Sequence, residues 1–282
     1  MRRSSKCALA MMVGMTMLVA CSDDKGKATA LNVVVTEDGG QVKIDVPPSI
    51  KGGVVNLSLK NSGQGPHSLQ FAKVAGDHTP DELVGELTNS EQGAPVPDWI
   101  SEGGGIGTVG PGQTGTASFK LTEGRHFAYD DESDEQDAPN STKGGVVEID
   151  VTAGSGGSLP EADATITATE YKFTTKGLKA GATKVRFENE GKEYHHVIAG
   201  PMVPGKTIDD VRAFFETEGE PVGPPPINFE AGVGTAVIDR GNAEVATLNL
   251  QAGKYAMVCF VNDRAGGPPH FTMGMLQEAT VT

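Results

Sequence analysis

Cys259-Phe-Val-Asn-Asp-Arg-Ala-Gly-Gly-Pro-Pro-His270-Phe-Thr-Met273-Gly-Met275 is the stretch that decides how this chain of 282 residues is interpreted. Together with His195, which lies well upstream, it offers one thiol, two imidazoles and a thioether. Soft sulfur and borderline nitrogen donors in this combination suit copper in both of its oxidation states. The stretch therefore predicts a mononuclear metal site in the C-terminal part of the chain.

The first twenty residues have the features of an export signal. Arg2, Arg3 and Lys6 precede a mostly apolar run that is too short to span a membrane comfortably. The run ends in Leu18-Val-Ala-Cys21, which resembles the bacterial lipobox, so we expect Cys21 to carry the lipid of the mature protein. A lipid would hold the protein on the extracytoplasmic face of a bacterial membrane. An ordinary signal peptide or an anchor helix is the alternative.

Cysteine usage singles out Cys259. Of the three cysteines, Cys7 leaves with the signal and Cys21 is used by the lipid. Cys259 then has no partner for an intramolecular disulfide. A lone thiol in an oxidising, exported setting is either buried and inert or held by a metal.

Composition narrows the fold and the partners. The formal net charge of −14, which removal of the basic signal makes more negative, argues against nucleic acid and against an anionic lipid surface as partners. It fits a basic protein partner or simple solubility. With 38 glycines, 17 prolines, few aromatic residues and frequent Val and Thr, the chain has the composition of short strands joined by turns, which predicts an all-β sandwich.

A repeat divides the chain. Asn61-Ser-Gly-Gln-Gly-Pro-His67 resembles Asn189-Glu-Gly-Lys-Glu-Tyr-His195, and each His is followed by an expected helix N-cap, at Thr79 and Thr207. Further landmarks keep nearly the same spacing. We therefore predict a signal peptide (1–20), a tether (21–30), a first domain (31–152), a Gly/Ser linker (153–160) and a second domain (161–282).

Alternating apolar and polar residues mark strands within each copy, and one short helix is expected in a long connection. The expected strands are 54–60, 116–121 and 146–151 in the first copy, and 183–189, 246–250 and 276–281 in the second. Antiparallel strands of this kind pack face to face as a Greek-key sandwich. The glycine-rich segment 101–107 is expected to form a loop, without the Lys or helix start that phosphate binding requires.

The second copy resembles the cupredoxin family over nearly all of its length. The resemblance rests on Asn189-x-Gly191 before His195, on Gly253-x-Tyr255 before Cys259, and on Pro269-His270 before Gly274-Met275. It implies a cupredoxin-like fold with a type-1 copper site whose ligands are His195, Cys259, His270 and Met275.

Two of these assignments have alternatives. Met273 could replace Met275 as the axial ligand, although the gap between His270 and Met275 is more similar to that of the cupredoxin family. His196 lies beside His195, and because adjacent strand residues point to opposite faces, only one of them should reach the metal. The segment between Cys259 and His270 is also longer than in small electron-transfer cupredoxins.

The first copy keeps His67 but lacks the other donors. Asp130 stands near the position of Cys259, and Asn140 or Ser141 near that of His270, so no complete copper site is expected there. The acidic run 130–137 is interpreted as a solvated loop, with a weak calcium site as the alternative.

The sequence thus predicts a membrane-anchored extracytoplasmic protein that uses copper for electron transfer or copper carriage, with a redox or copper-delivery protein as partner. The alternative is a metal-free envelope binding module. The related copper oxidases and nitrite reductases have a His beside the type-1 Cys that leads to a second copper centre. Because Val258 and Phe260 flank Cys259, we expect that the chain is not an enzyme.

Overall fold

The computed structural model describes residues 26–134, 138–217 and 223–282. The expected signal peptide and the expected lipidation site, Cys21, lie outside these ranges. Among the helices of the described ranges, none is both long enough and apolar enough to cross a membrane.

In the described part of the first half there are eight strands, one α-helix and one 3-10 helix. In chain order these are β1 (Thr29–Asp38), β2 (Gln41–Asp45), β3 (Ser49–Asn61), β4 (His67–Val74), α1 (Pro80–Glu91), β5 (Ile100–Val109), β6 (Thr114–Leu121), β7 (Gly124–Tyr129), η1 (Asn140–Lys143) and β8 (Val146–Gly156).

The second half repeats this order, with one extra 3-10 helix. Its elements are β9 (Ala164–Thr169), β10 (Lys172–Lys176), β11 (Gly181–Asn189), β12 (Ile198–Pro201), α2 (Ile208–Phe215), η2 (Phe229–Ala231), β13 (Val233–Gly234), β14 (Ala243–Leu250), β15 (Gly253–Val258), η3 (His270–Met273) and β16 (Leu276–Val281).

Strand pairing follows the same plan in both halves. β1 pairs with β2 and runs parallel to β3, as β9 pairs with β10 and runs parallel to β11. β4 pairs with β5 and β7, and β7 with β8, as β12 pairs with β13 and β15, and β15 with β16. The architecture is therefore the expected all-β sandwich, with the same order of strands and α-helices in both halves.

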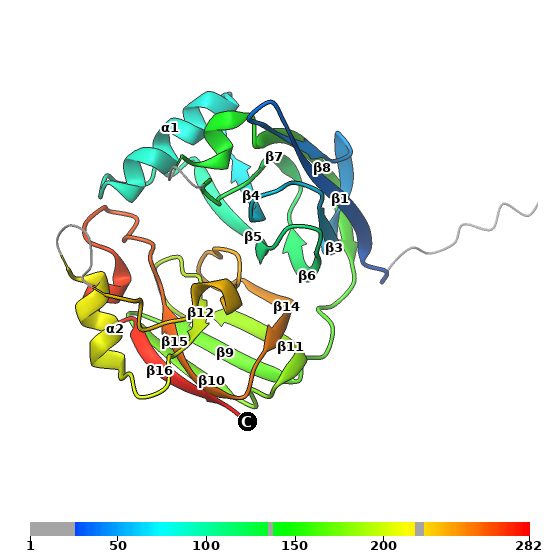
Figure 1. The fold of residues 1–282 in the computed structure, drawn as a ribbon. Coiled ribbons are helices and arrows are strands. Elements are labelled where there is room, and N and C mark those ends of the chain that lie inside the picture. Colours follow the sequence, from blue (N-terminus) through cyan, green and yellow to red (C-terminus); the bar gives the residue numbers. More distant parts are fainter. Residues whose placement is uncertain (1–25, 135–137, 218–222) are drawn as a thin grey trace, which may run out of the picture.

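The two halves are joined by a shared sheet. β14 pairs antiparallel with β6, so that one twelve-stranded sheet runs from β10 in the second half to β5 in the first. Figure 1 shows the halves one above the other, with β6 and β14 near the boundary. β13, β12, β15 and β16 form a separate four-stranded sheet. This second sheet carries the strand that leads to Cys259.

Both α-helices begin as the sequence predicts. Thr79 caps α1 by accepting from the backbone N–H of Glu82, whose side chain accepts from the Thr79 N–H in return. Thr207 and Asp210 form the same reciprocal pair at α2. Each box satisfies backbone donors that a helix start leaves free.

Two expectations need correction. Residues 153–156, assigned to the linker, continue β8 to Gly156. Residues 101–107, expected to form a loop, lie in β5. Glycine is a poor strand former, but here it permits close packing, because a Cβ on Gly105 would lie 1.9 Å from the Leu69 carbonyl oxygen.

Candidate metal centre

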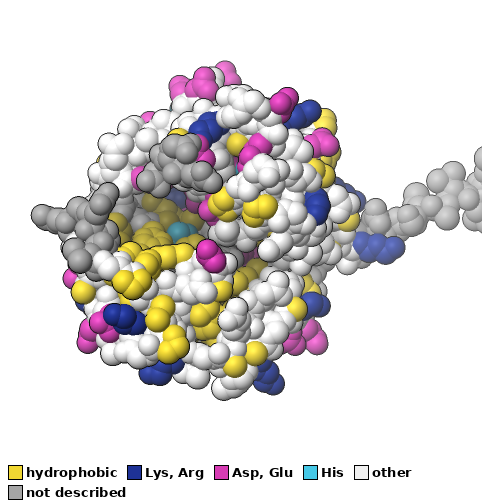
Figure 2. Space-filling view, in the orientation of Figure 1, with side chains coloured by type: hydrophobic (Ala, Val, Ile, Leu, Met, Phe, Trp, Pro, Cys, Tyr) yellow, Lys and Arg dark blue, Asp and Glu magenta, His cyan; other side chains and the backbone are white. Residues whose placement is uncertain are grey.

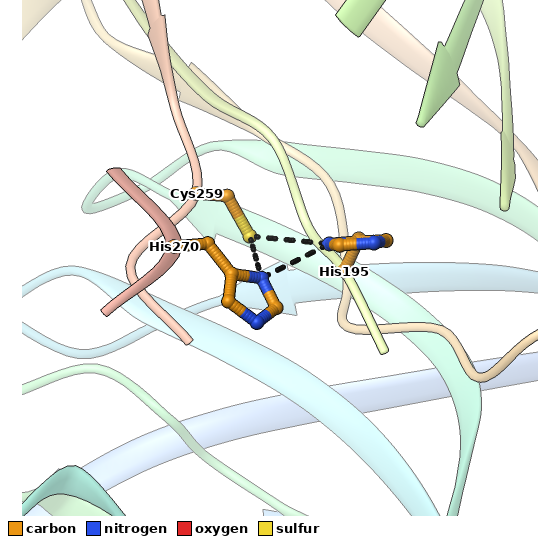
Figure 3. Close-up of side chains that lie close together, drawn as sticks. All are labelled: His195, Cys259 and His270. Atoms are coloured by element: carbon orange, nitrogen blue, oxygen red, sulfur yellow. Dashed lines mark hydrogen bonds between the residues drawn. The ribbon is translucent and has the colours of Figure 1, made fainter. Parts of the chain in front are cut away.

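Three side chains converge in the second half. The Nδ1 atoms of His195 and His270 lie 3.1 Å apart, and the Cys259 Sγ lies 3.8 Å from the first and 3.5 Å from the second (Figure 3). All three residues are fully buried. Across the described ranges, this is the one group of three or more His, Cys, Asp or Glu residues placed to share a metal ion.

The triangle has the size of a metal site. A point equidistant from the three atoms lies about 2.0 Å from each, close to the bond lengths that imidazole and thiolate make to a zinc-sized ion. Two nitrogens and one sulfur in a trigonal arrangement are the donors of a blue-copper centre. The donor set therefore fits copper in both its chemistry and its spacing.

Backbone pairing fixes where the ligand atoms lie. Cys259 follows β15 directly, its N–H donates to the Met275 carbonyl, and its own carbonyl accepts from Phe271. His195 exchanges two backbone hydrogen bonds with Ile238. The Asn189 side chain shapes the preceding turn by accepting from the Gly191 N–H and donating to the carbonyls of Glu193 and Ile238. The arrangement is thus preorganised by the sandwich rather than by an ion.

The environment keeps the free donors neutral. Burial, reinforced by His270, lowers the pKa of His195 to about 4, and burial likewise lowers the pKa of His270. Burial raises the pKa of the Cys259 thiol to about 12. At neutral pH both imidazoles therefore offer a lone pair, and a bound metal ion would have to displace the thiol proton.

The remaining expected ligands are placed as follows. Met275 is fully buried in the same core cluster as Cys259, and its N–H donates to the His270 carbonyl. Met273 ends η3 and is half-buried. His196 turns away from the triangle, and its Nε2 accepts from the Phe260 N–H at 2.9 Å. As expected, one of the two neighbouring histidines reaches the cluster, and that residue is His195; both lie just before β12 rather than within a strand, with His195 in an isolated bridge to Ile238.

His196 lines a cavity between the two halves. The cavity has a volume of about 170 Å³ and also involves Glu102 and Tyr129 of the first half. Figure 2 shows a hollow on this face of the molecule in which a histidine side chain is visible among hydrophobic side chains. Burial raises the pKa of Glu102 to about 8, so this carboxyl is largely protonated at neutral pH.

Sequence reasoning missed the groups that surround the ligands. The His270 Nε2 lies 2.9 Å from the Asp263 carboxylate, and the Tyr171 hydroxyl lies 2.9 Å from both oxygens of that carboxylate. Asp263 could have been found, since it is the sole acidic residue between Cys259 and His270 and metal-bound histidines commonly donate to a carboxylate. Tyr171 left no such signal, because it is remote in sequence.

The long segment between Cys259 and His270 rests on the first half. The Arg264 guanidinium donates to the Ile100 carbonyl of the first half and to Asp239 of its own half, and the Arg264 carbonyl accepts from Val96 of the first half. The Asn262 side chain donates to Ser90 at the end of α1. These contacts explain why the segment is long: it extends across the boundary between the halves to the surface of the first half.

The corresponding place in the first half holds an ion pair. His67 Nδ1 lies 2.5 Å from Asp130, and Nε2 lies 2.9 Å from Glu37. Asn140 donates to Asp130 at 3.1 Å. Burial alone would lower the pKa of His67, but the hydrogen bonds and charges of Asp130 and Glu37 outweigh burial and raise it. Asp130 is therefore part of a buried network and not of the solvated loop expected for the acidic run.

Neither a protein-family model nor a curated protein matches the chain. Similar solved structures include a multicopper oxidase, at 16% identity and a TM-score of 0.26, covering 92% of this chain and 94% of that one. A copper nitrite reductase from Nitrosomonas europaea aligns at 15% identity and a TM-score of 0.25, with the same two coverages. Reduced auracyanin from Roseiflexus castenholzii aligns at 17% identity and a TM-score of 0.30, covering 46% of this chain and 98% of its own.

The comparisons correct one expectation. The prediction that the chain is not an enzyme is wrong as a firm statement, because the structures that align with most of the chain include a multicopper oxidase and a copper nitrite reductase. The fold is one that enzymes also use.

Proposed function

We propose that this chain binds a single copper ion through His195, Cys259 and His270, with Met275 as the axial ligand, and that the ion transfers electrons. The buried triangle of two Nδ1 atoms and one Sγ carries the proposal. When bound, copper supplies a one-electron couple between Cu(I) and Cu(II). The protein's own part is to hold the donors in a geometry that changes little between the two states.

Burial favours electron transfer over copper carriage. A carrier has to release its ion, whereas all three donors here are fully buried and tied to neighbouring strands by backbone hydrogen bonds. Such a site favours a resident ion. Rapid loss of copper from the protein would favour copper carriage instead.

Aromatic side chains flank the ligands and support a protein partner. Phe260 directly follows Cys259 and is 36% exposed, and its ring packs against Phe271, which directly follows His270. The Phe215 ring packs against both Phe260 and Phe229, and Phe229 is 51% exposed. We propose that a redox protein contacts this surface, and the acidic charge of the chain favours a basic partner.

The test is a copper titration of the full-length chain in detergent, followed by visible absorption and paramagnetic resonance. We expect an intense thiolate-dependent visible band at one copper per chain, absent from Cys259→Ser and His270→Asn. His78→Gln is the control, because His78 stacks on Trp99 in the first half and is not one of the three donors. A wild type without the band would contradict the proposal and favour the metal-free binding module.

We also propose that residues 1–20 are removed and that Cys21 anchors the protein to the extracytoplasmic face of the membrane. The lipobox-like sequence supports this proposal. Cell fractionation of wild type and Cys21→Ala tests it. The wild type should sediment with membranes and the variant should be soluble outside the cytoplasm, whereas identical distributions would contradict the anchor.

A further inference from the structure

Tyr171 has an unusual backbone conformation. It occupies the two-residue turn between β9 and β10, where Thr169 pairs with Lys172, and its φ is +57°. Among the residues that the structure describes, it is the only one other than glycine with a positive φ. The left-handed region is unfavourable for a bulky aromatic residue, so such a residue persists there only when the surroundings hold it.

The first half provides an internal comparison. Its corresponding turn, between β1 and β2, is Gly39-Gly40, with φ values of +58° and +79°. Glycine adopts these conformations without steric cost. The half with the ion pair therefore uses the unstrained residues, and the half with the His-Cys-His triangle uses a tyrosine.

The strained turn places the Tyr171 phenol on Asp263. The hydroxyl donates to the Asp263 carboxylate, with both oxygens at 2.9 Å, and the same carboxylate accepts from His270 Nε2 at 2.9 Å. The Tyr171 ring also meets the His270 imidazole edge to face, with centroids 5.2 Å apart. Two contacts from one side chain thus act on one ligand, one through the carboxylate and one directly.

We propose that Tyr171 is a positioning residue for the metal centre. Its phenol holds the Asp263 carboxylate against His270, so that Nε2 keeps the proton and the Nδ1 lone pair faces Cys259 and His195. Asp263 lies on a segment without regular secondary structure and keeps 28% of its side chain exposed, so it needs a second partner to stay in place. The inference deepens the proposed copper function and rests on it.

The first measurement uses metal-free protein, so that it does not depend on copper. Nitrogen-15 resonances of the histidine side chains report which ring nitrogen carries the proton. In the full-length wild type, we expect His270 as the Nε2–H tautomer. In Tyr171→Phe, which keeps the ring and the backbone strain, we expect a mixture of the two tautomers. An unchanged His270 spectrum would overturn the inference.

The second measurement is Cu(II) affinity by chelator competition, with the resonance spectrum of the bound ion. Tyr171→Phe should bind Cu(II) about tenfold more weakly and with altered hyperfine splitting, as for other partners of metal-bound histidines. Tyr255→Phe is the matched control, because it removes a buried hydroxyl that accepts from Gln251 in the same half. The control should retain the wild-type affinity and spectrum.

The outcomes separate the two proposals. If Tyr171→Phe changes the His270 tautomer but the wild type binds no copper, the positioning role stays in place and the copper function is removed. Normal copper binding by Tyr171→Phe, with a wild-type spectrum, would remove the positioning role and leave the copper function in place. Loss of copper affinity in Tyr255→Phe as well would mean that the effect is structural, and it would overturn the inference.

Discussion

His67 Nδ1 lies 2.5 Å from the Asp130 carboxylate, at the place in the first half that corresponds to His195 and Cys259 in the second. One half thus fills its site with its own charges, and the other leaves neutral donors facing each other. The two sites can therefore be compared by substitutions within a single molecule.

The first-half site can be converted to metal binding. Asp130→Cys with Asn140→His would place a thiol and an imidazole beside His67, since both native side chains already lie within 3.3 Å of its Nδ1. We expect the copper stoichiometry to rise from one to two per chain. Asp130→Cys alone, lacking the second imidazole, is the control and should bind less tightly. A stoichiometry of one in the double variant would contradict the correspondence.

The His67 ion pair should make the first half sensitive to high pH. Because the folded-state pKa of His67 is raised above 6.5, its contribution to stability is complete below that value and is lost as pH rises through the folded pKa. His67→Gln should lower the free energy of unfolding by about 3 kcal/mol at pH 6, since it leaves Asp130 buried without its partner. Urea titrations should find a smaller difference at pH 9, and a constant difference would contradict the assignment.

Arg264 should couple copper retention to the first half. Arg264→Ala removes the contacts to Ile100 and Asp239 that hold the segment between the ligands. We expect faster hydrogen exchange in residues 260–269 and copper loss to a chelator accelerated by about tenfold, equivalent to about 1.4 kcal/mol. Arg125→Ala, which breaks a pair between the half-buried Arg125 and the exposed Glu148 in the first half, is the control. Equal rates in the two variants would show that the docking does not support the site.

Glu102 should make stability fall between about pH 4.5 and pH 8. Burial raises its pKa to about 8 in the folded protein, so folding favours its protonated form. The protonated carboxyl imposes no penalty below about pH 4.5. Between about pH 4.5 and pH 8 the free energy of unfolding therefore falls by about 1.4 kcal/mol per pH unit. Glu102→Gln, a neutral residue of similar shape, should be more stable than wild type at pH 8 and similar to it near pH 5. Parallel pH profiles for the two proteins would contradict the assignment.

Local patterns in the sequence predicted much of the fold and the candidate site. The capping boxes at Thr79 and Thr207 need neighbours only three residues apart, and both are present. The grouping of Cys259 with His270 was expected from their donor types and from the family resemblance, and the counterparts Asp130 and Asn140 followed from the repeat. Their roles as metal ligands, and the domain boundaries, stay predictions.

Relationships between distant residues could not be predicted in this way. Residues 101–107 were expected to form a loop because they are rich in glycine. The close approach of Gly105 to Leu69, which explains the glycines of this strand, is visible only once the strands are paired. The pairing of β6 with β14 and the contact of Tyr171 with Asp263 join segments that share no pattern. Tertiary packing decides these features: between the halves for β6 and β14, and within one half for the other two.

The shared sheet has a consequence for the evolution of the chain. If the first half were deleted, β14 would lose its neighbour β6 and become an edge strand with free N–H and C=O groups along Glu244, Val245 and Ala246. Exposed edges of this kind recruit other chains and promote aggregation. Selection for solubility is therefore sufficient to retain the first half, independently of any chemistry that it performs.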